Sequence, residues 1–191
     1  RMWLMLLTEM GCPSMEHSFI TGLVASRIKS ILQKPWKKIV RALKPSRSHR
    51  KLVDLAKYYG FDGYFINQET TGNLVEPLGP KLRDFLLYTK EYAKSINYPI
   101  KYSWYDAMTY EYGRYHENAL GEYNYNFMQP ENGENPVDTF FANFNWGKSE
   151  VDYSISTAKW IQRNPYDVLA GLELQKGGSY KTNVDWNAIL D

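Results

Sequence analysis

Hydrophobic residues follow two alternating spacings from residue 50 onward. In RKLVDLAKYYG, residues 50–60, apolar side chains recur at helical spacing, and Gly60 is suited to the position just after a helix. FDGYFIN, residues 61–67, is a short apolar run that is typical of a buried strand. The pattern predicts a helix followed directly by a strand.

The same succession repeats along the rest of the chain. Helical spacing returns over residues 78–97 and 149–164, and Asn164-Pro165 is expected to end the second of these helices. Residues 107–138 are rich in Tyr, Asn and Gly and are predicted to be irregular. The further predicted strands are residues 98–106, 139–146 and 167–175.

Alternating strands and helices favour parallel β/α units. We therefore predict an α/β fold, a partial (β/α)8 TIM barrel with about four recognisable strand–helix units. A doubly wound sheet is the alternative. No Gly-rich phosphate loop follows any predicted strand, which argues against a nucleotide-binding version of that alternative.

The first part of the chain differs in composition from the rest. Residues 1–51 hold 11 Lys or Arg against 2 acidic residues, whereas the remainder holds 12 against 19. The first Asp is Asp54, and the first of the 16 tyrosines is Tyr58. We predict an irregular basic arm over residues 1–48 and a partial barrel catalytic domain over residues 49–191.

Translation in a shifted reading frame is our hypothesis for the origin of the arm. Read one base earlier, codons for MWLMLLTEMGCPSMEHSFITGLV can encode DVVDAAHRNGVPVYGTLFYNWS, a strand-like string that restores Asp and Tyr. A solvated arm is the simpler alternative. A nucleic-acid-binding or membrane-binding arm is disfavoured, because no aromatic or groove-reading pattern accompanies the charge. The DNA sequence across codons 1–60 distinguishes these origins.

Composition also limits the possible partners. The net charge of +2 implies no particular partner, and we predict no nucleic-acid ligand. Cys12 is the single cysteine and excludes an internal disulfide. We expect no membrane span and no targeting signal, because MWLMLL is too short and lacks a following cleavage pattern. The three histidines form no spaced ligand set, so we predict neither a metal site nor a cofactor. The sequence does not define the oligomeric state.

Asn67 and Glu69 lie at the end of the first predicted strand after residue 50. Their spacing places both side chains on one face of an extended chain. Active sites of (β/α)8 barrels lie at this end of the strands. An acid there can protonate a glycosidic oxygen, and an amide can hold a substrate acetamido group that attacks the anomeric carbon. By itself, the spacing more often reflects an Asn that caps the next turn and a Glu in a surface loop.

The other predicted strands end in aromatic residues, amides and acids, which together favour a carbohydrate cleft. Aromatic rings stack on sugars, and fixed polar groups bind hydroxyls. A single Trp or Tyr at a strand end is more often part of the core. The residues are Trp104, Tyr105 and Asp106, then Asn143, Asn145 and Trp146, then Glu173 and Gln175.

Four segments in this order resemble glycoside hydrolase family 85, the endo-β-N-acetylglucosaminidases, and its bacterial D type most closely. The segments are LAKYYGFDGYFINQET, KYSWYDAMT, FFANFNW and NPYDVLAGLELQ, and the likeness covers about residues 50–191. The resemblance implies a (β/α)8 barrel that hydrolyses the β-1,4 bond in the N,N′-diacetylchitobiose core of N-linked glycans. In extent, the chain is expected to lack several strands of a complete barrel.

The resemblance also assigns roles to residues. Glu69 matches the general acid/base, and Asn67 matches the residue that orients the acetamido group through an oxazolinium intermediate. Tyr105 matches an active-site tyrosine near that group. Trp146 matches a cleft residue, and Trp104, Asp106, Asn143 and Asn145 match cleft residues less surely. Glu173 is a further substrate-binding candidate.

The alternative to an active enzyme is an inactive truncated or pseudogene fragment that retains at most weak carbohydrate binding. For a bacterial parent, the family resemblance implies an extracellular or cell-wall-associated protein. For a eukaryotic relative it implies a cytoplasmic one.

Overall fold

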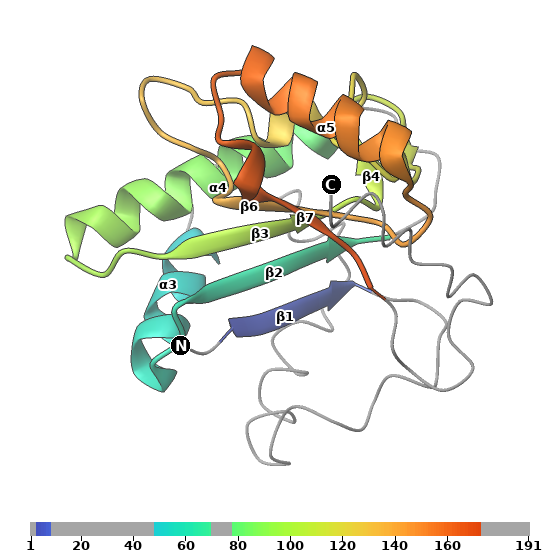
Figure 1. Ribbon diagram of the computed structural model, residues 1–191. Coiled ribbons are helices and arrows are strands. Elements are labelled where there is room, and N and C mark those ends of the chain that lie inside the picture. The colour runs from blue at the N-terminus through green and yellow to red at the C-terminus, as the bar shows by residue number, and fades with distance from the viewer. Residues whose placement is uncertain (1–2, 9–47, 70–77, 173–191) are drawn as a thin grey trace.

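Five parallel strands form one sheet in the computed structural model, which describes residues 3–8, 48–69 and 78–172 (Figure 1). The order is β1-β2-β3-β6-β7, so each strand pairs with the next strand of the sheet along the chain. A doubly wound sheet reverses its order at a switch point. The unreversed order follows the winding of the predicted partial barrel. The bounds are β1 Trp3–Thr8, β2 Gly63–Gln68, β3 Lys101–Tyr105, β6 Thr139–Ala142 and β7 Val168–Ala170.

Strand β1 is the one element of this sheet that the hydrophobic pattern does not predict. It lies within the range predicted to be an irregular arm, and it pairs with β2 in parallel over its whole length, from Trp3 opposite Gly63 to Thr8 opposite Gln68. WLMLLT is apolar enough for a strand but has no turn residues beside it to define its ends. The out-of-frame origin of residues 1–48 stays a prediction, and residues 9–47 lie outside the described residues.

Three helices confirm the predicted ones, α3 Ser48–Tyr59, α4 Leu78–Ser95 and α5 Lys148–Trp160. Helix α3 ends at Tyr59, and Gly60 follows it with a φ of +74°, the left-handed conformation that glycine adopts readily. After α5, the side chain of Asn164 accepts a hydrogen bond from the backbone N–H of Tyr166, and the short helix η3, Pro165–Asp167, follows. In Figure 1, α4 and α5 lie on the same side of the strands.

The predicted irregular segment between β3 and β6 contains three short elements. They are the antiparallel pair β4 and β5, Met108–Thr109 and Gly113–Arg114, and the helix η2, Tyr125–Phe127. The backbone N–H of Tyr110 donates to the carbonyl oxygen of Tyr123 at 2.7 Å, which joins this hairpin to the loop before η2. The segment therefore has a defined course even though it has little regular structure.

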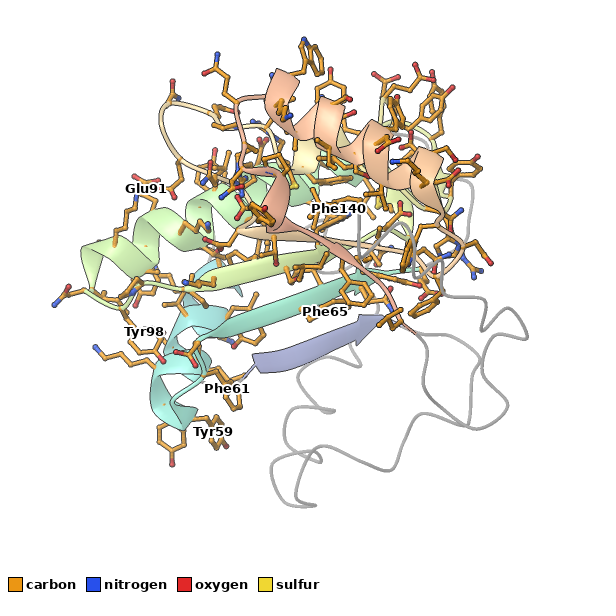
Figure 2. All side chains as sticks on the ribbon, viewed as in Figure 1. Tyr59, Phe61, Phe65, Glu91, Tyr98 and Phe140 are labelled. Carbon is orange, nitrogen blue, oxygen red and sulfur yellow. The ribbon has the colours of Figure 1, made fainter. Side chains whose placement is uncertain are left out.

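Alternate residues of each strand face opposite sides of the sheet. Tyr64 and Tyr102 face the helices, where their hydroxyls donate to the Leu52 carbonyl oxygen of α3 and to Thr89 Oγ1 of α4. Phe65 faces the other way and packs against Phe141 with ring centroids 5.4 Å apart. Figure 2 shows Phe140 toward α5 and Phe65 on the far side of β2 from that helix.

The helix side of the sheet holds the largest fully buried side chains, among them Trp104, Tyr64, Tyr102, Phe127 and Phe140. On the other side of the sheet, polar side chains lie at the carboxyl ends of the strands. None of the helices in the described ranges has the length and apolar character needed to cross a bilayer.

Candidate active site

Asn67 and Glu69 meet at the carboxyl end of β2. The strand carries Asn67 as its penultimate residue, and the Nδ2 of Asn67 donates a hydrogen bond to Oε1 of Glu69 at 2.9 Å. Asn67 is buried, whereas the side chain of Glu69 keeps 24% of its surface exposed. The amide is thus fixed by the fold, and the carboxyl group has access to solvent. This is the arrangement expected of an orienting amide beside a proton donor.

Tyr105 and Asn143 form a second polar pair at the ends of β3 and β6. The Tyr105 hydroxyl donates to Oδ1 of Asn143 at 2.6 Å, and both residues are buried. The amide nitrogen of Asn143 donates in turn to Oδ1 of Asn118 at 3.0 Å. The same Asn118 oxygen accepts from the backbone N–H of Asn145 at 3.3 Å. The tyrosine hydroxyl is therefore held by a chain of amides.

Asp106 joins this chain to the loop between β3 and β6. Its carboxylate accepts hydrogen bonds from the backbone N–H groups of Glu117, Asn118 and Asn143 and from Nδ2 of Asn124, at 3.2, 2.6, 3.5 and 3.1 Å. Asn118 has a φ of 60°, a left-handed conformation that Asn tolerates better than most residues. Burial raises the pKa of Asp106 to about 7, against the lowering effect of its four donors.

Asp106 is fully buried, so it positions neighbouring groups and offers no surface to a sugar. Glu117 lies beside Asp106. Burial is the larger cause, and repulsion from Asp106 the smaller, that raise the pKa of Glu117 to about 7. The structure thus places Asp106 beneath the polar groups at the strand ends, which differs from the predicted substrate contact.

Trp104 is also placed differently from the prediction. It is fully buried on the helix side of β3 and stacks on Phe127 with ring centroids 3.9 Å apart. The reason is the alternation of side chains along a strand, which puts Trp104 and the adjacent Tyr105 on opposite faces. We therefore assign Trp104 to the hydrophobic core.

Trp146 lies close to the end of β7. Its Nε1 donates to the carbonyl oxygen of Gly171 at 2.8 Å, and the side chain is buried. A Cβ atom on Gly171 would lie 2.5 Å from the Ala142 carbonyl oxygen, so only glycine allows this approach of β7 to β6. Asn145 is exposed and contributes its backbone N–H to the amide chain. Glu173 and Gln175 lie outside the described residues.

Two further neighbours of Glu69, Arg114 and His116, were not predicted from the hydrophobic pattern of the sequence. A guanidinium nitrogen of Arg114 on β5 lies 3.4 Å from Oε2 of Glu69. The imidazole of His116 lies 6.0 Å from the Tyr105 ring, centroid to centroid, and burial lowers its pKa while Glu69 opposes that shift. Both come from residues 107–138, and the only available signal was that an unusually long loop leaves the carboxyl end of a strand.

No group of three or more His, Cys, Asp or Glu side chains that suits a metal ion lies within the described ranges. The predicted absence of a metal site and of a cofactor stays a prediction. The polar groups at this edge are amides, carboxyl groups, a tyrosine hydroxyl, an indole, the Arg114 guanidinium and the His116 imidazole. Together they offer donors and acceptors that suit a ligand with many hydroxyl groups.

Comparison with known proteins gives a family. The model of glycosyl hydrolase family 85 matches residues 16–191, which include part of the predicted arm. The chain therefore belongs to this family, as its motifs indicate. The match covers the four strand-end segments on which the resemblance rests.

Two relatives are similar over much of the chain. The solved glycoside hydrolase domain of Endo-D from Streptococcus pneumoniae R6 is 68% identical, with a TM-score of 0.74, over 81% of this chain and 25% of that one. A cytosolic endo-β-N-acetylglucosaminidase 2 from Arabidopsis thaliana is 27% identical over 143 residues, 74% of this chain. This chain spans only 19% of the length of the plant relative.

Proposed function

We propose that the chain carries the acid/base and acetamide-orienting groups of an endo-β-N-acetylglucosaminidase. The observation that carries the proposal is the 2.9 Å hydrogen bond from Asn67 Nδ2 to Glu69 Oε1 at the carboxyl end of β2. Membership of glycosyl hydrolase family 85 supports it, as do the names of the two relatives. The proposed substrate is an N-linked glycan or glycoprotein, cleaved within its N,N′-diacetylchitobiose core.

The first step forms an oxazolinium ion. Glu69 donates its proton to the glycosidic oxygen that leaves, and the carbonyl oxygen of the substrate acetamido group attacks the anomeric carbon from the opposite face. Asn67 orients the acetamido group and stabilises the positive charge that spreads over it. Asn67 also donates a hydrogen bond to Glu69. One side chain therefore aligns the acetamido group and the Glu69 carboxyl group, and this alignment accelerates the reaction by positioning.

The second step restores the starting state. Glu69, now a carboxylate, removes a proton from water, and the water oxygen attacks the anomeric carbon as the oxazolinium ring opens. Two inversions at one carbon give retention of configuration. No side chain of the enzyme becomes covalently attached to the sugar.

Tyr105, Asn143 and Trp146 are the proposed contacts to the sugar that carries the acetamido group. The Tyr105 hydroxyl is fixed by Asn143, so it can meet the acetamido group with little loss of freedom. Asn145 and Glu173 are proposed as further contacts. Asp106 and Asn118 support these residues from behind.

For a bacterial parent, we propose an extracellular or cell-wall-associated location, where glycoproteins of a host are accessible. For a eukaryotic relative the family resemblance suggests a cytoplasmic location instead. Fractionation of the source cells, followed by an immunoblot for the chain, tests the bacterial proposal. Detection in the cytoplasm alone contradicts it.

Incubation of the 191-residue chain with a high-mannose or trimmed N-glycoprotein tests the activity itself. The expected result is a released glycan and a protein that keeps one N-acetylglucosamine per site, both measurable by mass spectrometry. An inactive fragment gives no mass change at any site. Release of the whole glycan together with its innermost sugar contradicts the proposed bond.

An Asn67→Gln variant separates the two steps. The longer side chain displaces the amide, so oxazoline formation is expected to slow by roughly 100-fold or more, because positioning contributes strongly to rate. Reaction of a supplied sugar oxazoline needs no such formation and is expected to slow much less. Equal losses with the two substrates contradict the role given to Asn67.

A further inference from the structure

The side-chain amide of Asn118 has one orientation, because backbone groups on both sides fix which of its atoms lies where. Its Oδ1 accepts from the backbone N–H of Asn145 at 3.3 Å, and its Nδ2 donates to the backbone carbonyl oxygen of His116 at 3.5 Å. A backbone N–H can only donate, and a backbone carbonyl oxygen can only accept. The oxygen of this amide therefore faces Asn145, and its nitrogen faces His116.

The fixed amide of Asn118 determines the orientation of the next amide, that of Asn143. Asn118 Oδ1 also accepts from Asn143 Nδ2 at 3.0 Å. The opposite orientation of Asn143 would place two acceptor oxygens against each other, which is costly in a buried site. Asn143 Oδ1 therefore points to Tyr105 and accepts its hydroxyl proton, at 2.6 Å. Asn143 and Tyr105 are both buried, so solvent competes little for these bonds.

The direction of these hydrogen bonds decides what the Tyr105 hydroxyl offers to a ligand. A phenolic hydroxyl has one proton to donate and lone pairs that accept. Tyr105 gives its proton to Asn143, so every further hydrogen bond at this oxygen is one that it accepts. The substrate acetamido group, which Tyr105 is proposed to contact, has one donor, its N–H. Its carbonyl oxygen needs a lone pair for attack on the anomeric carbon, and an accepting hydroxyl does not compete for that lone pair.

We infer that Asn118 is a positioning residue for the reaction, which acts through Asn143 to turn the lone pairs of Tyr105 toward the acetamido N–H of the substrate. This inference rests on the proposed function and concerns the same site. The N–H becomes more acidic as positive charge develops on the acetamido group. An acceptor there therefore stabilises the transition state more than the bound substrate. Loss of the Asn118 amide should accordingly lower kcat and leave KM nearly unchanged.

The backbone at Asn118 makes glycine the suitable replacement. Its φ of 60° is a left-handed conformation, which glycine adopts readily and alanine does not. Asn118→Gly removes the amide but keeps the backbone N–H that donates to Asp106 Oδ2 at 2.6 Å. The expected result is a fall in kcat for glycan release of roughly 3- to 10-fold, the scale of one hydrogen bond.

A double-variant cycle tests whether Asn118 acts through Tyr105. Asn118→Gly should lower kcat in the parent chain and have little further effect in a chain that already carries Tyr105→Phe. Asn118→Asp keeps an oxygen that accepts from Asn143 Nδ2, so it should retain more of the parent kcat than Asn118→Gly. An unchanged kcat in Asn118→Gly, equal fractional losses in both backgrounds, or a loss expressed in KM alone overturns the inference.

Asn132→Gly is the matched control for the change in the backbone. Asn132 also has a left-handed φ, 51°, and is exposed in the turn between Glu131 and Glu134. The substitution is expected to change neither kcat nor KM. A loss of kcat comparable to that of Asn118→Gly would assign the effect to the backbone and overturn the role given to the amide.

Exchange of the Asn143 side-chain amide in the resting chain separates this inference from the proposed function. Proton exchange with deuterated water is followed by NMR on chains that carry 15N-labelled asparagine, with the signal assigned from its absence in Asn143→Asp. Slow exchange in the parent and in Asn118→Asp, with faster exchange in Asn118→Gly, supports the direction of the hydrogen bonds even if the parent hydrolyses nothing. Exchange in the parent as fast as that of the exposed Asn132 amide overturns the inference without need of a variant that folds, even if the parent is active. Exchange that Asn118→Gly leaves unchanged also overturns it.

Discussion

The two edges of the sheet hold buried polar groups in different ways. At the amino-terminal edge, the guanidinium of Arg163 donates to the carbonyl oxygens of Met128, Val137 and Asp138 and to the Asp167 carboxylate, at 2.7 to 3.0 Å. Lys90 is buried 3.0 Å from the Asp138 carboxylate, and burial lowers its pKa. Arg163 therefore has four acceptors from the protein itself, and Lys90 has the Asp138 carboxylate.

At the carboxyl edge, asparagine side chains make the hydrogen bonds between the buried polar groups. Asn118 and Asn143 link Asp106 to Tyr105 by hydrogen bonds, and Asn124 donates to Asp106. The buried Asn67 donates to the partly exposed Glu69. In (β/α)8 barrels the first edge typically serves stability and the second serves catalysis. Substitutions at the two edges should therefore separate stability from activity.

The largest expected effect is on activity and comes from Glu69→Gln. Loss of the proton donor should reduce hydrolysis of a natural glycan by roughly 100- to 10,000-fold, the range of general acid catalysis. The melting temperature should change little because the side chain is partly exposed. Glu91→Gln is the matched control, since Glu91 is exposed on α4 away from this edge (Figure 2), and it should change neither property. Retained hydrolysis in the Glu69 variant contradicts the acid/base role.

Arg163→Met should have the opposite profile. Removal of the guanidinium leaves buried carbonyl oxygens without donors, and the expected cost is about 3 kcal/mol in the free energy of unfolding. Urea denaturation measures this loss, and kcat of the folded protein should stay within a few-fold of the parent value. Lys159→Met changes an exposed cation on α5 and serves as the control. A stable Arg163 variant argues against the role given to the amino-terminal edge.

Asp106 makes a pH-dependent contribution to stability. Its pKa is about 7 in the folded chain and 3.8 as its ordinary value, so the folded state binds more protons between these two pH values. Stability should therefore fall as pH rises from 4 to 7, by about 3 kcal/mol from this residue. Glu117, with a pKa also near 7, should act in the same direction.

Unfolding free energies of the parent and of Asp106→Asn at a series of pH values isolate this contribution. The parent should lose more stability than the variant between pH 4 and pH 7, because Asn does not titrate. Parallel curves for the two proteins contradict the assignment of the shift to Asp106.

The smallest expected effects come from two tyrosine hydroxyls, one at each edge. Tyr98 donates to the carbonyl oxygens of Ala56 and Phe61 near the amino-terminal edge, so Tyr98→Phe should cost about 1 kcal/mol of stability with little change in kcat. Tyr105→Phe should lower kcat roughly 10-fold with a small change in stability, because an oriented hydroxyl is lost at the site. Thermal unfolding and glycan release, measured on both variants, test the pair. A similar profile for the two substitutions contradicts the division between the edges.

Periodicity in the sequence was sufficient to predict α3, α4 and α5 and the strands β2, β3, β6 and β7 of the five-stranded sheet, because each has a clear hydrophobic face. It was also sufficient to predict that Asn67 and Glu69 lie together, since both follow one strand at a spacing of two. The same rule places Trp104 opposite Tyr105, so the core position of Trp104 follows from the sequence once the face of Tyr105 is chosen.

Other parts of the site depend on contacts between distant residues. The hydrogen bonds from Asn118 and Asn124 to Asp106 and the approach of Arg114 to Glu69 depend on how the loop after β3 folds back. The loop has no regular spacing of hydrophobic residues from which its conformation could be predicted. Strand β1 was not predicted, because its flanking residues do not mark its ends and its strand conformation depends on pairing with β2.

The stereochemistry of the first product tests the central claim, that Asn67 and Glu69 support substrate-assisted catalysis, most directly. Proton NMR of the newly formed anomeric centre, recorded within the first minutes of glycan hydrolysis and before mutarotation, distinguishes the two configurations. The account predicts the β-anomer, because two inversions occur at the same carbon. Initial formation of the α-anomer would contradict it, since that requires direct attack of water on the glycosidic bond.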